Sequence, residues 1–181
     1  MDAELAAVMD RPWPRASAIP AAFEQLFRAE YARVVRIAYR VVADQGEAED
    51  VAQDVFIAYY RAHPSDAPYA APWLHRAAAH TALNAVRSRS RRTAREERDA
   101  LTPDASGDPE GAALERERAR EVRAALARMP RASAELLALR YSGLSYAEVA
   151  AASGTKIDQV GTRLRRAHDA FRREVSREQH R

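Results

Sequence analysis

The sequence contains no cysteine and only one lysine, Lys156, among its 181 residues. The lack of cysteine excludes a disulfide framework and a thiolate metal site. No apolar run approaches the ~20 residues that a membrane-spanning helix needs. The N-terminus also lacks the basic start and continuous apolar core of a signal peptide. We therefore expect a soluble, cytoplasmic protein.

Large aliphatic residues are also scarce, because alanine supplies 41 of the hydrophobic residues that make up 47% of the chain. This composition favours thin, alanine-lined interfaces between helices over a deep core. The basic residues are almost all arginine, 28 in number, although the net charge is only +3. Guanidinium groups suit bidentate contacts to phosphate and guanine. A GC-rich genome would enrich the same residues, so composition alone is weak evidence for nucleic-acid binding.

Residues 144–173 predict two helices joined by a tight turn. Ser145 and Glu148 have the spacing of a capping box, and Gly154 provides the positive φ at which a helix ends. A second helix follows, with an apolar stripe at Ile157, Val160 and Leu164. Arginines lie off this stripe, which is typical of a helix-turn-helix whose second helix enters the DNA major groove. The alternative is an ordinary helical hairpin with a solvated basic face.

The first half of the chain predicts three helices behind a flexible arm, residues 1–19. Apolar residues spaced by three and four predict a helix over 20–43. Asp44 and Glu47 can cap a second helix that runs to about residue 61 and has an acidic surface. A loop with three prolines, 62–72, precedes a third helix that begins at Pro72 and continues into an arginine-rich run. Its polar side chains, which we expect to face partly outward, include His75, His80 and Asn84.

A change to aspartate, proline, glycine and serine marks residues 99–112 as a linker between two domains. The first domain would comprise residues 20–98, and the second, residues 113–175, would be a compact four-helix unit. In the second unit we expect Leu136, Leu137, Leu139 and Tyr141 to lie inside, and a polar tail follows at 176–181. The predicted fold is all-α, with two small helical domains joined by a flexible linker and a helix-turn-helix in the second.

Three stretches together resemble the sigma factors of the extracytoplasmic function (ECF) group, within the sigma-70 superfamily. Residues 47–61 resemble that family's helix for binding core polymerase, and residues 73–92 resemble its promoter-melting helix. Residues 129–167 resemble its second domain, with the helix-turn-helix. The stretches occur in the family's order and lie on either side of a linker, which makes the combination more specific than any one motif.

The resemblance implies a promoter-specificity subunit without catalytic activity or cofactor, whose partners are the RNA polymerase core enzyme, promoter DNA and an anti-sigma factor. It implies polymerase-binding residues on the second helix: Asp50, Gln53, Asp54 and Phe56. It implies contacts to the opened minus-ten element from Tyr69, Trp73, His80, Asn84, Arg87 and Arg91. Trp73 has the alternative of a purely structural role. The implied contacts to the minus-thirty-five duplex are Lys156, Thr162, Arg163, Arg165 and Arg166.

Four positions depart from the family pattern. The melting helix usually carries asparagine where this chain has His80, aspartate where it has Asn84, and isoleucine where it has Ala77. Gly161 replaces a basic or polar residue of the recognition helix, at a cost of about 1 kcal/mol in helix propensity relative to alanine. These changes leave the fold prediction intact and leave the promoter sequence undetermined.

Three other functions remain as alternatives. A stand-alone helix-turn-helix regulator would form a dimer and bind a palindrome without polymerase. A degenerate relative would bind polymerase but not initiate transcription. An enzyme acting on nucleic acid would need a metal site. Asp50 and Asp54 form only a pair of acids, and the histidines of the first half show no ligand spacing, so no metal site is predicted.

Overall fold

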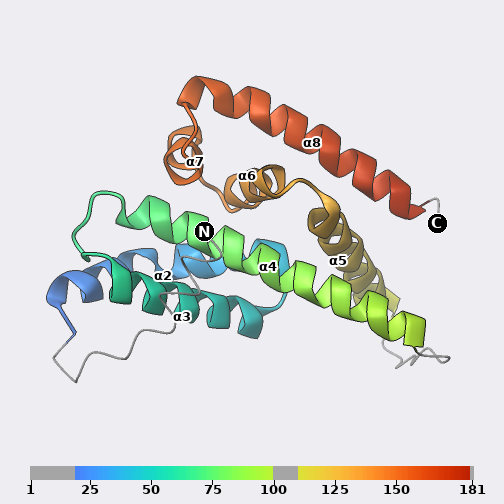
Figure 1. Cartoon of the computed structure of the whole chain (residues 1–181), viewed down its shortest axis with the longest axis horizontal. Helices are drawn as coiled ribbons and strands as arrows, with labels where there is room; N and C mark the ends of the chain where they lie inside the picture. Colours follow the sequence, from blue (N-terminus) through green and yellow to red (C-terminus); the bar gives the residue numbers. More distant parts are fainter. Residues whose placement is uncertain (1–18, 100–109, 180–181) are drawn as a thin grey trace.

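The computed structural model describes residues 19–99 and 110–179, which form helices and short turns with no strand among them (Figure 1). The helices are α2 (Ala21–Val42), α3 (Gln45–Ala62), α4 (Ala70–Asp99), α5 (Glu110–Arg128), α6 (Arg131–Tyr141), α7 (Tyr146–Ser153) and α8 (Ile157–Gln179). None of them is long and apolar enough to cross a membrane. The predicted N-terminal arm up to residue 18 and most of the predicted linker lie outside the described residues.

The predicted helices are present, with boundaries that shift by a few residues. The third helix begins at Ala70, so Pro72 lies in its first turn, where its missing N–H costs nothing. The same helix continues to Asp99 and makes the arginine-rich run helical. At the start of α3, the Asp44 side chain accepts a hydrogen bond from the Glu47 backbone N–H at 2.8 Å, which confirms the predicted cap.

Helix α4 is the central element of the molecule. Helices α2 and α3 pack on one side of it, and α5, α6 and α7 pack against it from the other half of the chain (Figure 1). Its alanines at 77–79 and 82 are fully buried, as are Leu74 and Leu83. Small side chains let neighbouring helices approach from several directions, so α4 is buried on most of its circumference.

The helix-turn-helix is confirmed in α7 and α8. Ser145 and Glu148 form both hydrogen bonds of a capping box, and Gly154 ends α7 with φ 64° in the left-handed region. Val160 and Leu164 are buried as predicted. Ile157 is 57% exposed, so its predicted inward orientation is wrong. As the first residue of α8 it extends past the neighbouring helices.

Tyr141 was also predicted to lie inside and is instead 59% exposed, with its ring edge-on to His168 at 5.6 Å. The reason is the same as for Ile157. Tyr141 is the last residue of α6, so its side chain extends beyond the part of the helix that packs against its neighbours. Leu136, Leu137 and Leu139 are buried as predicted. In α6 and α8, periodicity therefore placed the middle of the helix correctly and failed at one end.

The two halves pack against each other. We call α2–α4 the front unit and α5–α8 the rear unit. Buried apolar residues of both units form one continuous cluster, from Val34 in α2 to Ala170 in α8. Helices α6 and α7 lie over α4, and α6 also contacts α2. Nothing in the sequence predicted this arrangement of the units.

Candidate nucleic-acid interface

Of the residues predicted to contact the minus-ten element, all but Tyr69 share one face of α4, together with Ala77, and Tyr69 lies in the loop just before the helix. Their spacing by three and four puts them in a single stripe along the helix: Trp73, Ala77, His80, Asn84, Arg87 and Arg91. The start of the stripe adjoins the loop at 63–69, and its end lies in the exposed arginine-rich part of the helix. Between these ends, the rear unit covers the stripe.

The loop end of the stripe is an aromatic cluster. The His63 ring lies 5.0 Å from Tyr59, 4.8 Å from Trp73 and 5.8 Å from Tyr69. Burial, followed by the charges of Tyr69 and Asp66, raises the pKa of Tyr59 to about 12, and its hydroxyl donates to the Pro64 carbonyl at 2.8 Å. This bond holds the loop against the helices. Tyr69 is 46% exposed and presents its ring at the edge of the cluster, where a base can stack.

Trp73 has the packing contacts of a structural residue. It is half-buried, packs on the front unit's core and contacts Tyr59 edge-on at 5.3 Å. Its partial exposure still leaves part of the side chain next to the loop.

His80 and Asn84 do not face outward as expected, because α6 of the rear unit lies against them. His80 is 4% exposed. Its Nδ1 lies 3.0 Å from a Glu135 carboxylate oxygen, and its Nε2 lies 2.7 Å from a guanidinium nitrogen of Arg131. The same nitrogen of Arg131 donates to the Asn84 Oδ1. An imidazole that donates from Nδ1 and accepts at Nε2 satisfies both contacts.

Glu135 is kept ionised by this environment. Burial alone would raise the pKa of Glu135, but its hydrogen bond to His80 and the nearby charges of Arg131 and Arg76 lower it. Sequence reasoning missed Arg131 and Glu135 because, within the stretch 129–167, they lie on the helix that precedes the helix-turn-helix. They are spaced i, i+4 and form an ion pair at 3.3 Å, which by itself is an unremarkable surface pattern.

The arginine end of the stripe lies beside the rear unit. Arg87 donates to the Met129 carbonyl at 2.7 Å, whereas Arg91 is exposed and bonds Ser88 on its own helix. Both arginines, with Arg128 and Arg131, line a cleft of about 470 Å³ between the units. Guanidinium groups at this density attract anions such as DNA phosphates.

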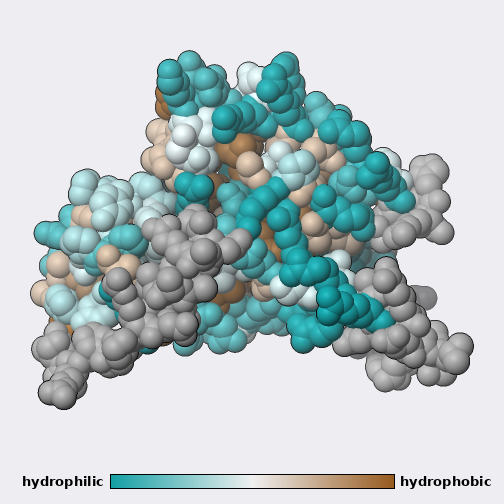
Figure 2. Space-filling view, viewed as in Figure 1, coloured by the Kyte–Doolittle hydropathy of each residue, from teal (hydrophilic) through white to brown (hydrophobic). Residues whose placement is uncertain are grey.

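The second candidate DNA surface is the outer face of α8. Thr162, Arg163, Arg165 and Arg166 are exposed on this face, and Lys156 is exposed just before the helix begins. Arg163 donates to the Thr155 hydroxyl at 2.8 Å. Figure 2 shows hydrophilic residues gathered over α7 and α8 and along the C-terminal part of α4. This face is open to a duplex.

One arginine near this surface was missed from the sequence. Arg140 of α6 lies over the Tyr146 ring at 5.6 Å and donates to the Leu144 carbonyl at 3.0 Å. With Arg165, His168 and Arg172 it lines a hollow beside the recognition helix. Its position on the preceding helix gave no sequence signal.

The acidic face of α3 carries the predicted polymerase contacts. Asp50, Gln53 and Asp54 are exposed. Partial burial and the neighbouring charge of Asp50 raise the pKa of Asp54. The carboxylates of Asp50 and Asp54 lie one helical turn apart on this face. Their negative charges suit a cationic partner.

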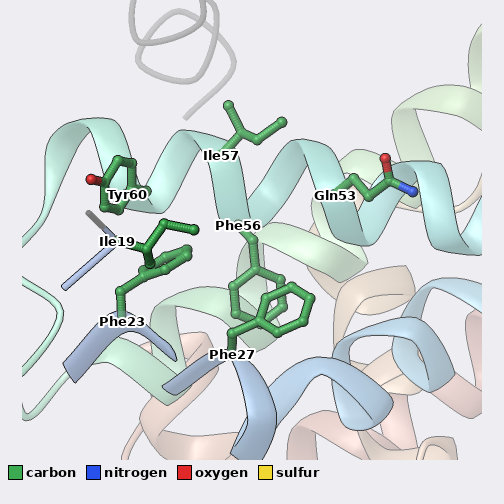
Figure 3. Close-up of a pocket in the computed structure, with 7 residues that line it drawn as sticks. All are labelled: Ile19, Phe23, Phe27, Gln53, Phe56, Ile57 and Tyr60. Carbon is green, nitrogen blue, oxygen red and sulfur yellow. The ribbon is translucent and has the colours of Figure 1, made fainter. Parts of the chain in front are cut away.

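Phe56 differs from the other three, since it is only 2% exposed. It packs among the rings of Phe23, Phe27 and Tyr31 and forms the floor of an apolar groove between α2 and α3. The groove has a volume of about 180 Å³, and Gln53 lies at its end (Figure 3). Phe56 can thus meet a partner only through the groove.

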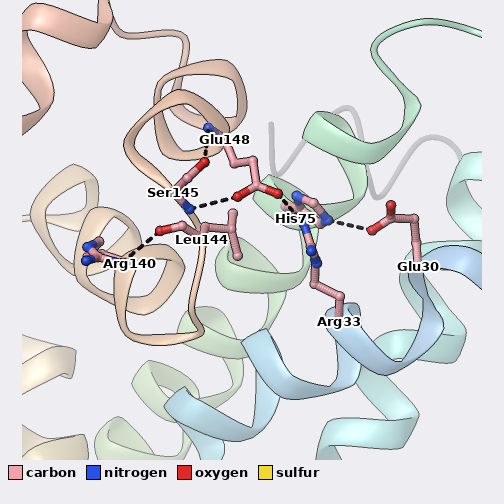
Figure 4. Close-up of polar contacts among 7 residues, drawn as sticks. All are labelled: Glu30, Arg33, His75, Arg140, Leu144, Ser145 and Glu148. Carbon is pink, nitrogen blue, oxygen red and sulfur yellow. Dashed lines mark hydrogen bonds and ion pairs between the residues drawn. The ribbon is translucent and has the colours of Figure 1, made fainter.

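A polar network links the front unit to the helix-turn-helix. Glu148 completes the cap of α7 and also pairs with Arg33 of α2 (Figure 4). Hydrogen bonds with Ser145, together with Arg33, lower the pKa of Glu148 to about 2 despite some desolvation. Nearby, His75 lies 2.8 Å from Glu30. His75 was expected to face partly outward and is 3% exposed, because α7 packs over α4 at this point.

No group of three or more histidine or carboxylate side chains that could hold a metal gathers within residues 19–99 and 110–179. The pair Asp50 and Asp54 is therefore not part of such a group in this part of the chain.

Comparison with known proteins gives the same order of regions. A family model for sigma-70 region 2 matches residues 26–92, and one for sigma-70 region 4 matches residues 119–168. The RNA polymerase sigma-H factor of Pseudomonas aeruginosa is 32% identical over 165 residues, which cover 83% of this chain and 84% of that protein.

The ECF RNA polymerase sigma factor SigE of Mycolicibacterium smegmatis is also 32% identical, over 155 residues. The match covers 83% of this chain but only 60% of that protein's length. Among solved structures, CnrH in complex with the cytosolic domain of CnrY aligns over 96% of both chains with a TM-score of 0.51 and 22% identity. This likeness shows a shared fold.

Proposed function

Because this chain belongs to the sigma-70 family of RNA polymerase sigma factors, within its extracytoplasmic function group, we propose that it directs the core enzyme to specific promoters and initiates transcription there. The observation that carries the proposal is the order of the two matched regions on the two helical units. An acidic face precedes an aromatic and arginine-rich stripe, and a basic helix-turn-helix follows.

Each surface has a chemistry that suits one step. The exposed carboxylates Asp50 and Asp54, with Gln53 and the adjacent groove floored by Phe56, would bind core polymerase. Negative charge of this kind speeds association with a cationic surface and fixes its orientation.

Promoter opening would use the loop at 63–69 and the stripe on α4. Separating a base from its duplex costs a few kcal/mol, which stacking and hydrogen bonding of the captured base offset. Tyr69 and Trp73 offer ring faces, His80 and Asn84 offer hydrogen-bonding groups, and Arg87 and Arg91 would hold phosphates. The exposed residues Lys156, Thr162, Arg163, Arg165 and Arg166 would contact the minus-thirty-five duplex through the major groove.

The proposal assigns no catalysis to this chain, because the polymerase performs the chemistry. It places the protein in the cytoplasm with the polymerase. It also includes an anti-sigma factor as a partner, for which the apolar groove and acidic face of α3 are the candidate surface.

The test is run-off transcription with purified core polymerase on a promoter library. Sequence-specific transcripts that require this chain support the proposal, and Arg165→Ala with Arg166→Ala should reduce them on templates that depend on the minus-thirty-five element. A matched control is Arg173→Ala, which removes an exposed charge farther along the same helix. Absence of transcripts from every template, with the protein alone retarding a palindromic duplex, would instead establish a stand-alone regulator.

A further inference from the structure

The apolar groove between α2 and α3 is open at the surface of the front unit. Aromatic rings of both helices line it, and the ring centroid of Phe23 lies 4.7 Å from that of Tyr60 (Figure 3). Phe27 is 36% exposed although it packs on the ring of Phe56. The groove has a volume of about 180 Å³, and a cavity of roughly 150 Å³ accommodates benzene. It can therefore take one aromatic side chain of a partner.

The groove lies beside the point where the described part of the front unit begins. Ile19, the first described residue, itself lines the groove and is 65% exposed. The N-terminal segment before it, residues 1–18, contains one aromatic side chain, Trp13, and no other phenylalanine, tyrosine or tryptophan occurs outside the described residues. The chain from Trp13 to Ile19 can span up to ~20 Å, whereas the groove extends along about one turn of α2, or ~6 Å. Trp13 can therefore reach every part of the groove.

The sequence around Trp13 lowers the entropic cost of docking. Pro12 and Pro14 flank Trp13. Proline fixes its own φ and favours extended backbone in the residue before it. A segment with fewer accessible conformations loses less entropy when it binds. The short connection to α2 also gives Trp13 an effective concentration in the millimolar range at the groove, so weak contacts are sufficient.

The charges of the segment and of the groove rim are complementary. Arg11 and Arg15 lie on either side of the Pro-Trp-Pro sequence. On α3, Asp50 is one helical turn from Gln53, which lies at the end of the groove, and one turn from Asp54 (Figure 3). Both carboxylates are exposed. Two cations that flank an aromatic residue thus match two anions beside an apolar groove.

We propose that Trp13 fills the groove between α2 and α3 in the free protein and that its two flanking arginines pair with the carboxylates of the acidic face. The N-terminal segment is then an intramolecular competitor for partners of this surface. It lowers their apparent affinity according to the fraction of molecules in which the groove is filled. The effect on core polymerase rests on the proposed function, whereas docking of the segment does not.

Docking is tested by the fluorescence of Trp13 without any partner. Subtracting the spectrum of Trp13→Phe from that of wild type isolates this emission, because Trp73 is the only other tryptophan. The emission should lie at a shorter wavelength than in urea-unfolded protein and be protected from quenching by acrylamide. Ile57→Lys places a charge in the groove lining and should remove both effects in the same subtraction. The matched control is Val122→Lys on α5, which is 39% exposed and should change neither.

A second variant tests the same contact from the segment. Arg11→Glu with Arg15→Glu removes the complementary charges and should also shift the emission to longer wavelength, so it replaces Ile57→Lys if circular dichroism shows that variant to be unfolded. Emission equal to that in urea, or emission that folded variants of both kinds leave unchanged, would overturn docking in the groove. Emission that shifts on dilution would assign the groove to Trp13 of a second copy and overturn the intramolecular contact.

Competition is measured by titrating the chain with core polymerase and following anisotropy. Because the natural chain has no cysteine, a dye can be attached at Arg173→Cys, an exposed position on α8. Trp13→Ala should bind polymerase at least about fivefold more tightly than wild type, the lower end of typical coupling between sites. Trp13→Phe keeps an aromatic ring and should bind more like wild type.

Equal or weaker polymerase binding by Trp13→Ala would overturn the competitor. That result would leave the proposed function intact if polymerase with the wild-type chain still transcribes from specific promoters. Absence of specific transcription with the wild-type chain would overturn the function instead, and the fluorescence of Trp13 would still decide whether the segment docks.

Discussion

Replacing the two exposed carboxylates of α3 with asparagine should weaken polymerase binding without weakening the fold. Asp50 and Asp54 lie one turn apart, and partial burial with the charge of Asp50 raises the pKa of Asp54. Because the pKa of Asp54 is higher in the folded state than in the unfolded state, its ionisation opposes folding. The stability that the protonated carboxyl contributes is therefore lost as the pH rises. Removing this like-charge pair should leave stability at pH 7 unchanged or raise it by about 0.2–0.5 kcal/mol.

The effect on binding should have the opposite sign. Loss of an exposed charge pair costs about 0–1 kcal/mol of free energy, and loss of a buried interfacial pair costs about 2–5 kcal/mol of binding free energy. The cost for a partly desolvated carboxylate should lie between these values. At about 1–1.5 kcal/mol for each, the variant Asp50→Asn with Asp54→Asn should bind core polymerase about 30- to 150-fold more weakly. Anisotropy of the dye-labelled chain titrated with core polymerase measures this change, and thermal unfolding monitors the fold.

The matched control is Asp169→Asn, which removes one exposed carboxylate from α8. It should bind polymerase like wild type, whereas Asp54→Asn alone should already bind more weakly. If the double variant is stable and binds as tightly as wild type, the assignment of the acidic face to polymerase is wrong.

Two further predictions concern stability. Gly161→Ala should raise the unfolding free energy by about 1 kcal/mol, because alanine has the higher helix propensity. The added Cβ fits, since it would meet Tyr146 at an ordinary 3.6 Å. In calorimetry the unfolding midpoint should rise by about 2–4 °C, and a lower midpoint would contradict this. Burial lowers the pKa of His75 although Glu30 opposes the shift, so the unfolded chain takes up a proton more readily as pH falls below 6.5. Urea titrations at pH values from 7 to 5 should therefore show that the free energy of unfolding falls less in His75→Gln than in wild type. An identical fall in both proteins would refute the reasoning.

Local features of the rear unit were predictable because their causes are local. The capping box of Ser145 and Glu148 depends on a spacing of three residues, and the left-handed conformation at Gly154 depends on one residue type. The buried stripe through Val160 and Leu164 follows from helical periodicity. The exposed arginines of α8 were likewise evident, since they lie off that stripe.

Helical periodicity identifies the residues that share a face, but it does not identify what covers the face. The stripe that includes His80 and Asn84 was evident from spacing, whereas its cover by Arg131 and Glu135 joins residues 47 to 55 positions apart. Glu148 shows both levels at once: its bond to Ser145 was predictable, and its pairing with Arg33, 115 positions away, was not.

The sequence by itself determined the helices, the helix-turn-helix and the family, because each follows from short-range spacing or from a recognisable order of motifs. Only the tertiary structure decided that Phe56 forms the floor of a groove, that His75 is buried and that the rear unit closes over α4. These features arise where two distant surfaces meet, and the chemistry of either surface alone is equally compatible with exposure to water.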